Sequence, residues 1–150
     1  MKVRTVEEMR SLAAQFAREV MPQDRHATLV ALSGDLGAGK TTFAQAVAKA
    51  LGVEEDVTSP TFVIEKIYKL SGQKFDRLVH IDAYRLESPH EIEVLGFKEL
   101  LRDPKNLILL EWPERVAGLL PEDAVKVRFD ITGEERTISI NGEEKDGTGS

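Results

Sequence analysis

The residues with the clearest chemical pattern are 34–41, which read Gly-Asp-Leu-Gly-Ala-Gly-Lys-Thr and match G-x-x-x-x-G-K-[ST]. Glycines let the backbone curl around an anion so that successive N–H groups point at it, and the positive end of a following helix strengthens the attraction. The Lys40 ammonium group would reach the β- and γ-phosphate oxygens, and the Thr41 hydroxyl would bind Mg²⁺. The pattern therefore predicts a nucleoside triphosphate site.

The segments around this loop have the order that such a site needs. An apolar run at 29–32 precedes the loop, and a helical pattern at 43–51, closed by Gly52, follows it. A glycine-rich turn that only caps a helix is the purely structural alternative. The order of strand, loop and helix favours phosphate binding.

Two acidic residues stand at the ends of other apolar runs. Asp82 follows residues 78–81, and Glu111 follows residues 107–110. In open α/β sheets, ligands collect at the carboxyl ends of the strands. Glu111 follows the run most typical of a buried central strand and suits a metal carboxylate, whereas Asp82 suits the orientation of an attacking water or coupling to a mobile segment. The residues alone leave the division of roles open.

Residues 57–62 place hydroxyl groups on both sides of Pro60. The structural interpretation is a capped turn before a strand, which composition alone favours. The functional interpretation is a switch segment, in which Ser59 or Thr61 senses the γ-phosphate or its metal.

The helical periodicity predicts several further elements. A capping box at 5–8 opens a helix that ends before Pro22. Ser88, followed by a proline at the first helical position, opens another, which Gly96 weakens and which ends at Asp103. A short helical piece that runs to Leu120 follows residues 112–115.

Two hairpins are predicted: one over 62–70 and 77–82, from β-forming residues around a turn at 71–73, and one over 125–131 and 136–140, from alternating residues. The predicted fold class is α/β: a P-loop NTPase-like three-layer sandwich with a central mixed, partly parallel sheet, flanking helices and a C-terminal β-hairpin. One ATPase domain is predicted over 1–140, and 141–150 are predicted to be a flexible tail because they are glycine-rich, charged and free of aromatic residues.

The composition narrows the functional classes. The 150 residues, 41% of them hydrophobic and 31% charged, suit one globular domain. No apolar run approaches the roughly 20 residues of a membrane span, and the start does not resemble a secretion signal, so the expected location is the cytoplasm, with no membrane contact. Without cysteine, a metal must be held by oxygen or imidazole, which favours Mg²⁺. The net charge of −6 argues against an unaided grip on nucleic acid.

Four segments together resemble the TsaE family, formerly called YjeE. They are residues 34–42, Ser-Pro-Thr-Phe at 59–62, His-Ile-Asp-Ala-Tyr-Arg-Leu at 80–86 and Leu-Glu-Trp-Pro-Glu-Arg at 110–115. The family consists of small bacterial ATPases of the pathway that places threonylcarbamoyl on adenosine 37 of tRNAs. The resemblance runs from about Thr5 to Ile140, and its last two segments are the most specific.

The resemblance implies roles for individual residues. Thr41 and Glu111 would arrange Mg²⁺, Asp82 and Lys40 would be catalytic, and Ser59 and Thr61 would form the family's switch segment. The residues implied to bind the nucleotide are Gly34, Asp35, Gly37, Ala38, Gly39, Lys40, Thr41 and Thr42. The implied ligands are ATP, ADP after turnover, and Mg²⁺.

The resemblance also names the partners as TsaD and TsaB, with tRNA contacted only indirectly through their complex. A protein of this kind should hydrolyse ATP slowly alone, because a partner completes its active arrangement. A small-molecule kinase is the alternative enzyme, although no arginine-rich lid segment is found. A GTP-driven switch is disfavoured because no Asn-Lys-x-Asp segment appears. A nucleotide-dependent assembly module that does not hydrolyse remains open.

The other candidate residues receive structural interpretations. None of the histidines, His26, His80 and His90, has a partner at metal-binding spacing, so no ligand role is assigned to them. Arg85 and Arg115 could stabilise transition-state charge, but solvated structural arginines are favoured. Trp112 adjoins the metal carboxylate and could shape or report on the site. Arg136 and the segment 5–6 are candidates to border adenine.

Overall fold

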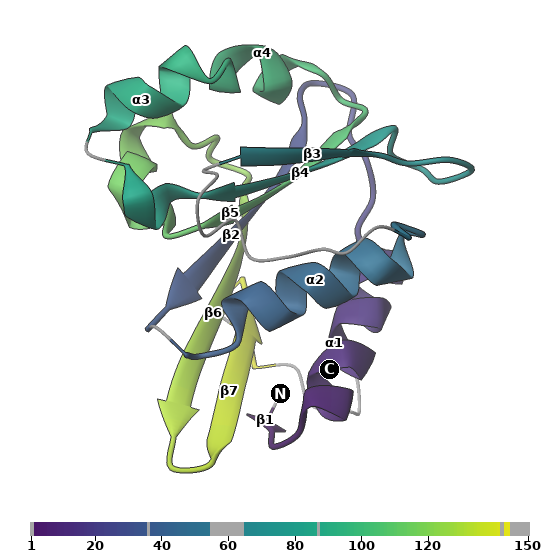
Figure 1. Cartoon of the computed structure of the whole chain (residues 1–150), viewed down its shortest axis with the longest axis vertical. Helices are drawn as coiled ribbons and strands as arrows, with labels where there is room; N and C mark the ends of the chain where they lie inside the picture. Colours follow the sequence, from purple (N-terminus) through teal and green to yellow (C-terminus); the bar gives the residue numbers. More distant parts are fainter. Residues whose placement is uncertain (1, 36, 55–64, 87, 142, 145–150) are drawn as a thin grey trace.

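One mixed sheet crosses the molecule (Figure 1). The computed structural model describes residues 2–35, 37–54, 65–86, 88–141 and 143–144. The described strands are β1 (Lys2–Val3), β2 (Thr28–Gly34), β3 (Glu65–Lys69), β4 (Arg77–Asp82), β5 (Asn106–Glu111), β6 (Val125–Thr132), β7 (Glu135–Ile140) and β8 (Glu143–Glu144). Their order across the sheet is β1-β7-β6-β2-β5-β4-β3, and β8 pairs with β7.

The middle of the sheet is parallel. β2 pairs in parallel with β5 on one side and with β6 on the other, and β5 pairs in parallel with β4. The outer pairs β3–β4, β6–β7 and β1–β7 are antiparallel. Every residue of β5 is buried, as expected for a central strand covered on both faces. The carboxyl ends of the parallel strands therefore meet at one edge of the sheet.

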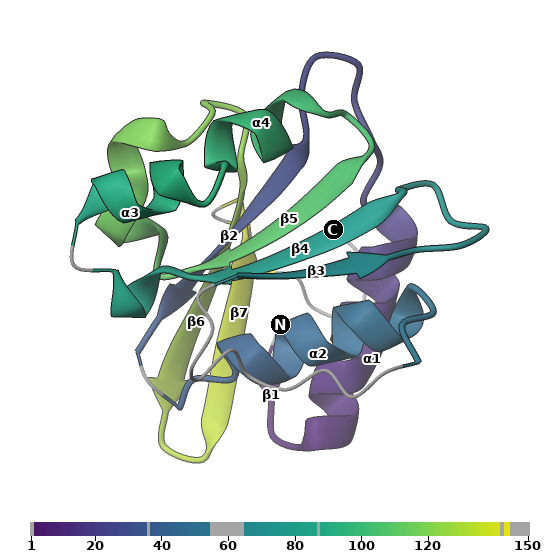
Figure 2. The same cartoon turned by 45° about the horizontal axis from the view of Figure 1, so that its top comes forward.

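Helices cover both faces of the sheet. The helices are α1 (Val6–Glu19), α2 (Lys40–Ala50), α3 (Pro89–Val94) and α4 (Phe97–Arg102), with 3₁₀ segments η1 (Ala83–Arg85) and η2 (Pro113–Leu119). Alternate residues of β2 face opposite layers: Val30 and Leu32 pack with α1 and α2, whereas Leu29 and Ala31 pack with α3, α4 and η2. Figure 2 shows the two pairs of helices on opposite sides of the sheet. The predicted three-layer α/β sandwich is confirmed.

The start of α1 follows the predicted cap only in part. Thr5 Oγ1 accepts a hydrogen bond from the Glu8 backbone N–H at 3.1 Å, as expected. The Glu8 carboxylate accepts a hydrogen bond from the Thr5 hydroxyl, at 3.5 Å, whereas a capping box would have it accept from the Thr5 backbone N–H. The helix ends at Glu19, before Pro22, as predicted.

The single helix predicted from Pro89 to Asp103 is wrong. Two short helices, α3 and α4, occupy this stretch and are separated at Gly96, which has a φ of 81°. A left-handed residue cannot continue a right-handed helix, so the glycine that was expected to weaken the helix interrupts it. Ser88 precedes α3 with an extended backbone but its side chain makes no capping hydrogen bond.

Both predicted hairpins are confirmed, and one strand is new. β3 and β4 pair over Glu65–Lys69, while β6 and β7 pair around a turn at Gly133. β1, which the sequence analysis did not predict, pairs with β7. Within residues 141–150, which the sequence analysis predicted to be a tail, β8 pairs with Ser139 and Ile140.

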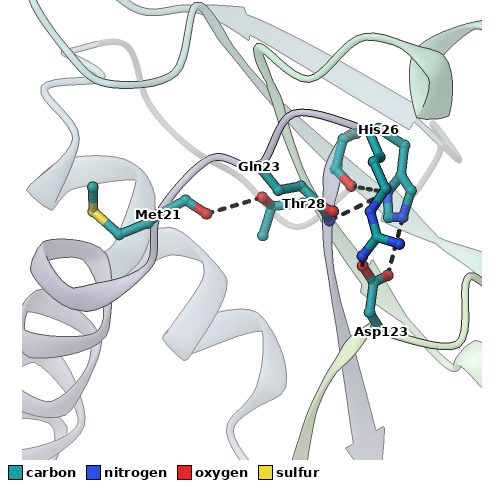
Figure 3. Close-up of polar contacts among 7 residues, drawn as sticks. Met21, Gln23, His26, Thr28 and Asp123 are labelled. Atoms are coloured by element: carbon teal, nitrogen blue, oxygen red, sulfur yellow. Dashed lines mark hydrogen bonds and ion pairs between the residues drawn. The ribbon is translucent and has the colours of Figure 1, made fainter.

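The linker of residues 20–27 fixes β2, the strand that leads to the glycine-rich segment beginning at Gly34 (Figure 3). The Thr28 hydroxyl donates to the Met21 carbonyl at 3.2 Å. The Nε2 atom of His26 lies 3.1 Å from a carboxylate oxygen of Asp123, in the turn before β6. The start of β2 is therefore tied both to the end of α1 and to the neighbouring strand. Among the described helices, none is long and apolar enough to cross a membrane.

Candidate nucleotide site

The candidate site lies at the edge where the parallel strands end. Gly34 ends β2, Asp82 ends β4 and Glu111 ends β5. Glu111 is in register with Asp82 on one side and with Leu32 on the other. The sheet thus places Glu111 in the strand next to β2, which runs into the glycine-rich loop, and Asp82 one strand further away.

The loop that follows β2 has a backbone that requires glycine at two positions. Gly34 has a φ of 143°, and a Cβ built there would lie 2.3 Å from the Phe129 carbonyl oxygen. Gly39, immediately before α2, has a φ of 104°, and its Cβ would lie 2.7 Å from the Met9 side chain. The loop can therefore turn tightly between β6 and α1 and deliver the chain to the first residue of α2.

Thr41 and Glu111 make the central polar contact of the site. The Thr41 hydroxyl donates to Glu111 Oε1 at 3.0 Å and lies 3.3 Å from Oε2. Glu111 is only 3% exposed. Two residues 70 positions apart in the chain thus present neighbouring oxygen atoms beside the loop.

Lys40 is buried beside the loop and folds back onto it. Its ammonium group donates to the Gly34 carbonyl and lies 3.5 Å from the centroid of the Trp112 ring. Burial lowers the pKa of Lys40, and the negative charges of Glu111, Glu114, Asp82 and Asp35 oppose this shift. The lysine and the acidic residues of this edge therefore act on one another electrostatically.

Asp82 is half-buried and caps η1. Its carboxylate accepts the backbone N–H of Tyr84 at 3.0 Å. The Tyr84 ring in turn packs on Trp112, with centroids 5.0 Å apart. Asp82 thus links the end of β4 to η1, whose Tyr84 ring contacts Trp112.

A cavity of about 200 Å³ opens next to the loop, between the start of α1 and the turn before β7. Arg4 closes part of it, because its guanidinium pairs with the Glu135 carboxylate, with Nε 2.8 Å from Oε1. This pairing lowers the pKa of Glu135. The residues that line the cavity are Val3, Arg4, Thr5, Val6, Met9, Gly37, Gly39, Thr42, Glu134 and Arg136.

The structure brings most of the predicted site residues to this edge. Asp35 and Ala38 belong to the loop, where the Ala38 N–H donates to the Asp35 carbonyl at 3.1 Å. Ser59 and Thr61, the predicted switch residues, lie outside the described residues. Arg115 is exposed and lies over the Tyr84 ring, 5.5 Å from its centroid, which is a structural contact.

His80 was missed by the sequence analysis. Its Nε2 atom lies 2.6 Å from Glu111 Oε2, and its side chain is 1% exposed. The signal was present in the strand pattern, because residues 78, 80 and 82 of β4 share one face and the last of them is a predicted site residue. The search for metal-binding spacing overlooked a histidine that contacts a carboxylate.

Comparison with known proteins gave consistent results. The family model described as threonylcarbamoyl adenosine biosynthesis protein TsaE matches residues 3–138. Proteins named tRNA threonylcarbamoyladenosine biosynthesis protein TsaE are similar to this chain. The one from Rickettsia prowazekii is 40% identical over 138 residues, 91% of this chain and 90% of that protein. The one from Haemophilus influenzae is 35% identical over 114 residues, 76% of this chain and 70% of that protein.

A solved structure has the same fold. The crystal structure of Bacillus subtilis YdiB superimposes with a TM-score of 0.72 at 28% identity, and the match covers 92% of this chain and 80% of that one.

Proposed function

The chain belongs to the TsaE family of threonylcarbamoyladenosine biosynthesis proteins, and from this premise we propose that it is a Mg²⁺-dependent ATPase. We further propose that it supports the modification of adenosine 37 in tRNA by acting on a complex of TsaD and TsaB. It would contact tRNA only through that complex, in keeping with its net charge of −6.

The contact between Thr41 and Glu111 carries the proposal. A hydroxyl and a carboxylate that adjoin each other at the start of α2 are oxygen ligands of the kind that Mg²⁺ prefers. Mg²⁺ is commonly held by one or two carboxylates together with substrate phosphates and water, so these residues fit it. When bound, the ion would neutralise charge on the phosphate oxygens.

Lys40 and the loop backbone would hold the phosphates. The backbone N–H groups at the start of α2 have no partner within the helix, and the helix dipole favours an anion there. Lys40, whose ammonium group now faces the Gly34 carbonyl and the Trp112 ring, is close enough to turn toward an anion in the loop.

Asp82 would orient the attacking water. It stands beside Glu111 in the neighbouring strand, so it can act on the same phosphate group without being the metal ligand itself. The adjacent cavity would take the nucleoside, with Arg136 and the start of α1 at its border.

Two substitutions test the proposal. Thr41→Ala and Glu111→Gln should abolish most of the Mg²⁺-dependent gain in affinity for a non-hydrolysable ATP analogue, measured by calorimetry with Mg²⁺ and with EDTA. Thr132→Ala, at an exposed threonine of β6, is the matched control and should behave like the wild type. Failure of the wild-type protein to bind the analogue would refute the proposal.

Partner dependence needs a separate measurement. Phosphate release by the wild-type protein should be slow alone and should accelerate when TsaD and TsaB are added, because a partner would complete the active arrangement. Fast turnover that is equal with and without the two proteins would contradict this part of the proposal.

A further inference from the structure

His80 and Glu111 form a buried contact that the proposed chemistry does not yet use. The imidazole Nε2 atom lies 2.6 Å from Glu111 Oε2, and both side chains are almost completely buried, at 1% and 3% exposed. A carboxylate that binds a metal ion is ionised and can only accept hydrogen bonds, so in that state the imidazole donates its Nε2–H to Glu111. A buried carboxylate needs such donors, because its desolvation is costly.

The strand register explains why the two side chains meet. Leu78 and His80 lie on the face of β4 that packs toward α2, and Leu109 and Glu111 lie on the same face of β5. His80 is in register with Leu109, and Glu111, two residues beyond Leu109, is the next residue of β5 on the same face. α2 begins above this point and brings Thr41 to the same carboxylate.

The contacts of Glu111 restrict how its carboxylate can turn. Thr41 Oγ1 is nearer to Oε1, at 3.0 Å, than to Oε2, at 3.3 Å. His80 approaches Oε2. A donor on each side therefore fixes the plane of the carboxylate and leaves Oε1 directed toward Thr41.

We propose that His80 is a positioning residue, whose Nε2–H holds the Glu111 carboxylate in the orientation that binds Mg²⁺ together with Thr41. This inference rests on the proposed function. Residues that hold metal ligands in place commonly contribute about 10–100-fold to metal affinity. The alternative is that His80 only satisfies a buried polar group and supports the fold.

Two amide substitutions separate these roles. In glutamine, the side-chain nitrogen is as many bonds from Cβ as the imidazole Nε2, whereas in asparagine it is one bond closer. His80→Gln can therefore still donate to Glu111, and His80→Asn cannot reach it. Both variants keep a polar group at the buried position, so they should lower the stability of the fold to a similar extent.

The quantity to measure is the ratio of affinities for a non-hydrolysable ATP analogue with Mg²⁺ and with EDTA. His80→Asn should reduce this ratio by about 10–100-fold while its affinity in EDTA stays near that of the wild type. His80→Gln should keep most of the wild-type ratio. Leu78→Ala, buried on the same face of the same strand, is the control: it should lower the melting temperature and leave the ratio unchanged.

Several outcomes would overturn the inference. The first is an affinity ratio in His80→Asn that equals the wild-type ratio, and the second is a loss of affinity in His80→Asn that is the same with Mg²⁺ and with EDTA. The third is a ratio that falls as far in His80→Gln as in His80→Asn. The fourth is a ratio that falls as far in Leu78→Ala as in His80→Asn. If His80→Asn does not fold, His80→Gln alone decides. An affinity ratio in His80→Gln that falls below the wild-type ratio contradicts the inference, and a ratio that stays near the wild-type value supports it. A wild-type protein that binds no analogue would refute the proposed function instead.

Discussion

The ammonium group of Lys40 lies 3.5 Å from the centroid of the Trp112 ring. Trp112 has a φ of 61°, which is uncommon for a residue other than glycine, and this backbone conformation directly follows the end of β5. A cation above an indole is attracted to the electron-rich face of the ring. Nucleotide phosphates would therefore have to compete with the Trp112 ring for contact with the Lys40 ammonium group.

If the chain binds nucleotide as proposed, this contact should make Trp112 a reporter of binding. It is the only tryptophan in the sequence, so all tryptophan emission comes from this side chain. Titration with Mg²⁺ and a non-hydrolysable ATP analogue should change the emission, because Lys40 would move from the ring to the phosphates. Lys40→Ala should weaken binding about tenfold or more, since hydrogen bonds to charged groups contribute about 1.5–3 kcal/mol.

The control for this experiment is Trp112→Phe, followed by calorimetry. This variant should still bind the analogue but should lack the signal. Binding that is visible by calorimetry in the wild type while its emission stays constant would show that the indole and Lys40 do not separate.

A conservative substitution of Asp82 separates hydrolysis from assembly. In Asp82→Asn the remaining carbonyl oxygen can still accept the Tyr84 N–H, so η1 should keep its cap. Loss of the carboxylate should slow phosphate release by about 100-fold or more, with affinity for the analogue within a few-fold of the wild type. Phosphate release and threonylcarbamoyl transfer, both with TsaD and TsaB present, are the measurements.

The non-hydrolysing assembly module makes the opposite prediction for transfer. In that case Asp82→Asn should support repeated transfer as well as the wild type does, and only Lys40→Ala should fail. Phosphate release by Asp82→Asn at the wild-type rate would show that Asp82 has no catalytic role, whatever the transfer assay shows.

The parallel core of the fold was predictable because its signals are local. The run 107–110 is apolar throughout, and β5 is buried at every position. The acidic residue that follows each run could be placed at one edge, because parallel strands share the direction of their carboxyl ends. The alternation of 125–131 likewise predicted β6 and its hairpin.

Other features depend on contacts between distant residues, which spacing does not reveal. β1 has only two residues, and its pairing with β7 joins positions more than a hundred apart, such as Val3 and Arg136. The contact of His80 with Glu111 depends on the register of β4 and β5. The break at Gly96 was visible as a weak point, but whether a glycine bends or ends a helix is decided by its φ in the folded chain.

Gly34 should be intolerant of a side chain for reasons of packing as well as backbone. Gly34→Ala would place a Cβ 2.3 Å from the Phe129 carbonyl oxygen at a φ of 143°. β2 and β6 would have to separate, and we expect the free energy of unfolding to fall by at least about 2 kcal/mol. Urea denaturation measures this change.

Gly72→Ala is the matched control for this measurement. Gly72 also has a positive φ, 68°, but a Cβ there would meet nothing within 4 Å. It should cost only the left-handed backbone penalty, about 1–2 kcal/mol. An equal loss of stability in both variants would show that the contact with Phe129 contributes nothing.

Glu65 should make the stability of the protein depend on pH. Burial raises the pKa of this carboxyl, and its Oε1 atom has no hydrogen-bond partner within the described part of the chain. The folded protein therefore binds a proton more tightly than the unfolded chain. Stability should fall as the pH rises from the ordinary pKa of a glutamic acid through the raised value in the folded protein.

Glu65→Gln removes this titration. The variant should be more stable than the wild type at neutral pH, and the difference should shrink toward zero below the ordinary pKa of a glutamic acid. Urea denaturation of both proteins at pH values from about 4 to 8 gives the comparison. Glu54→Gln, at an exposed position, removes the same charge and serves as the control. A gain that is independent of pH, or one that Glu54→Gln reproduces, would show that desolvation of Glu65 is not its cause.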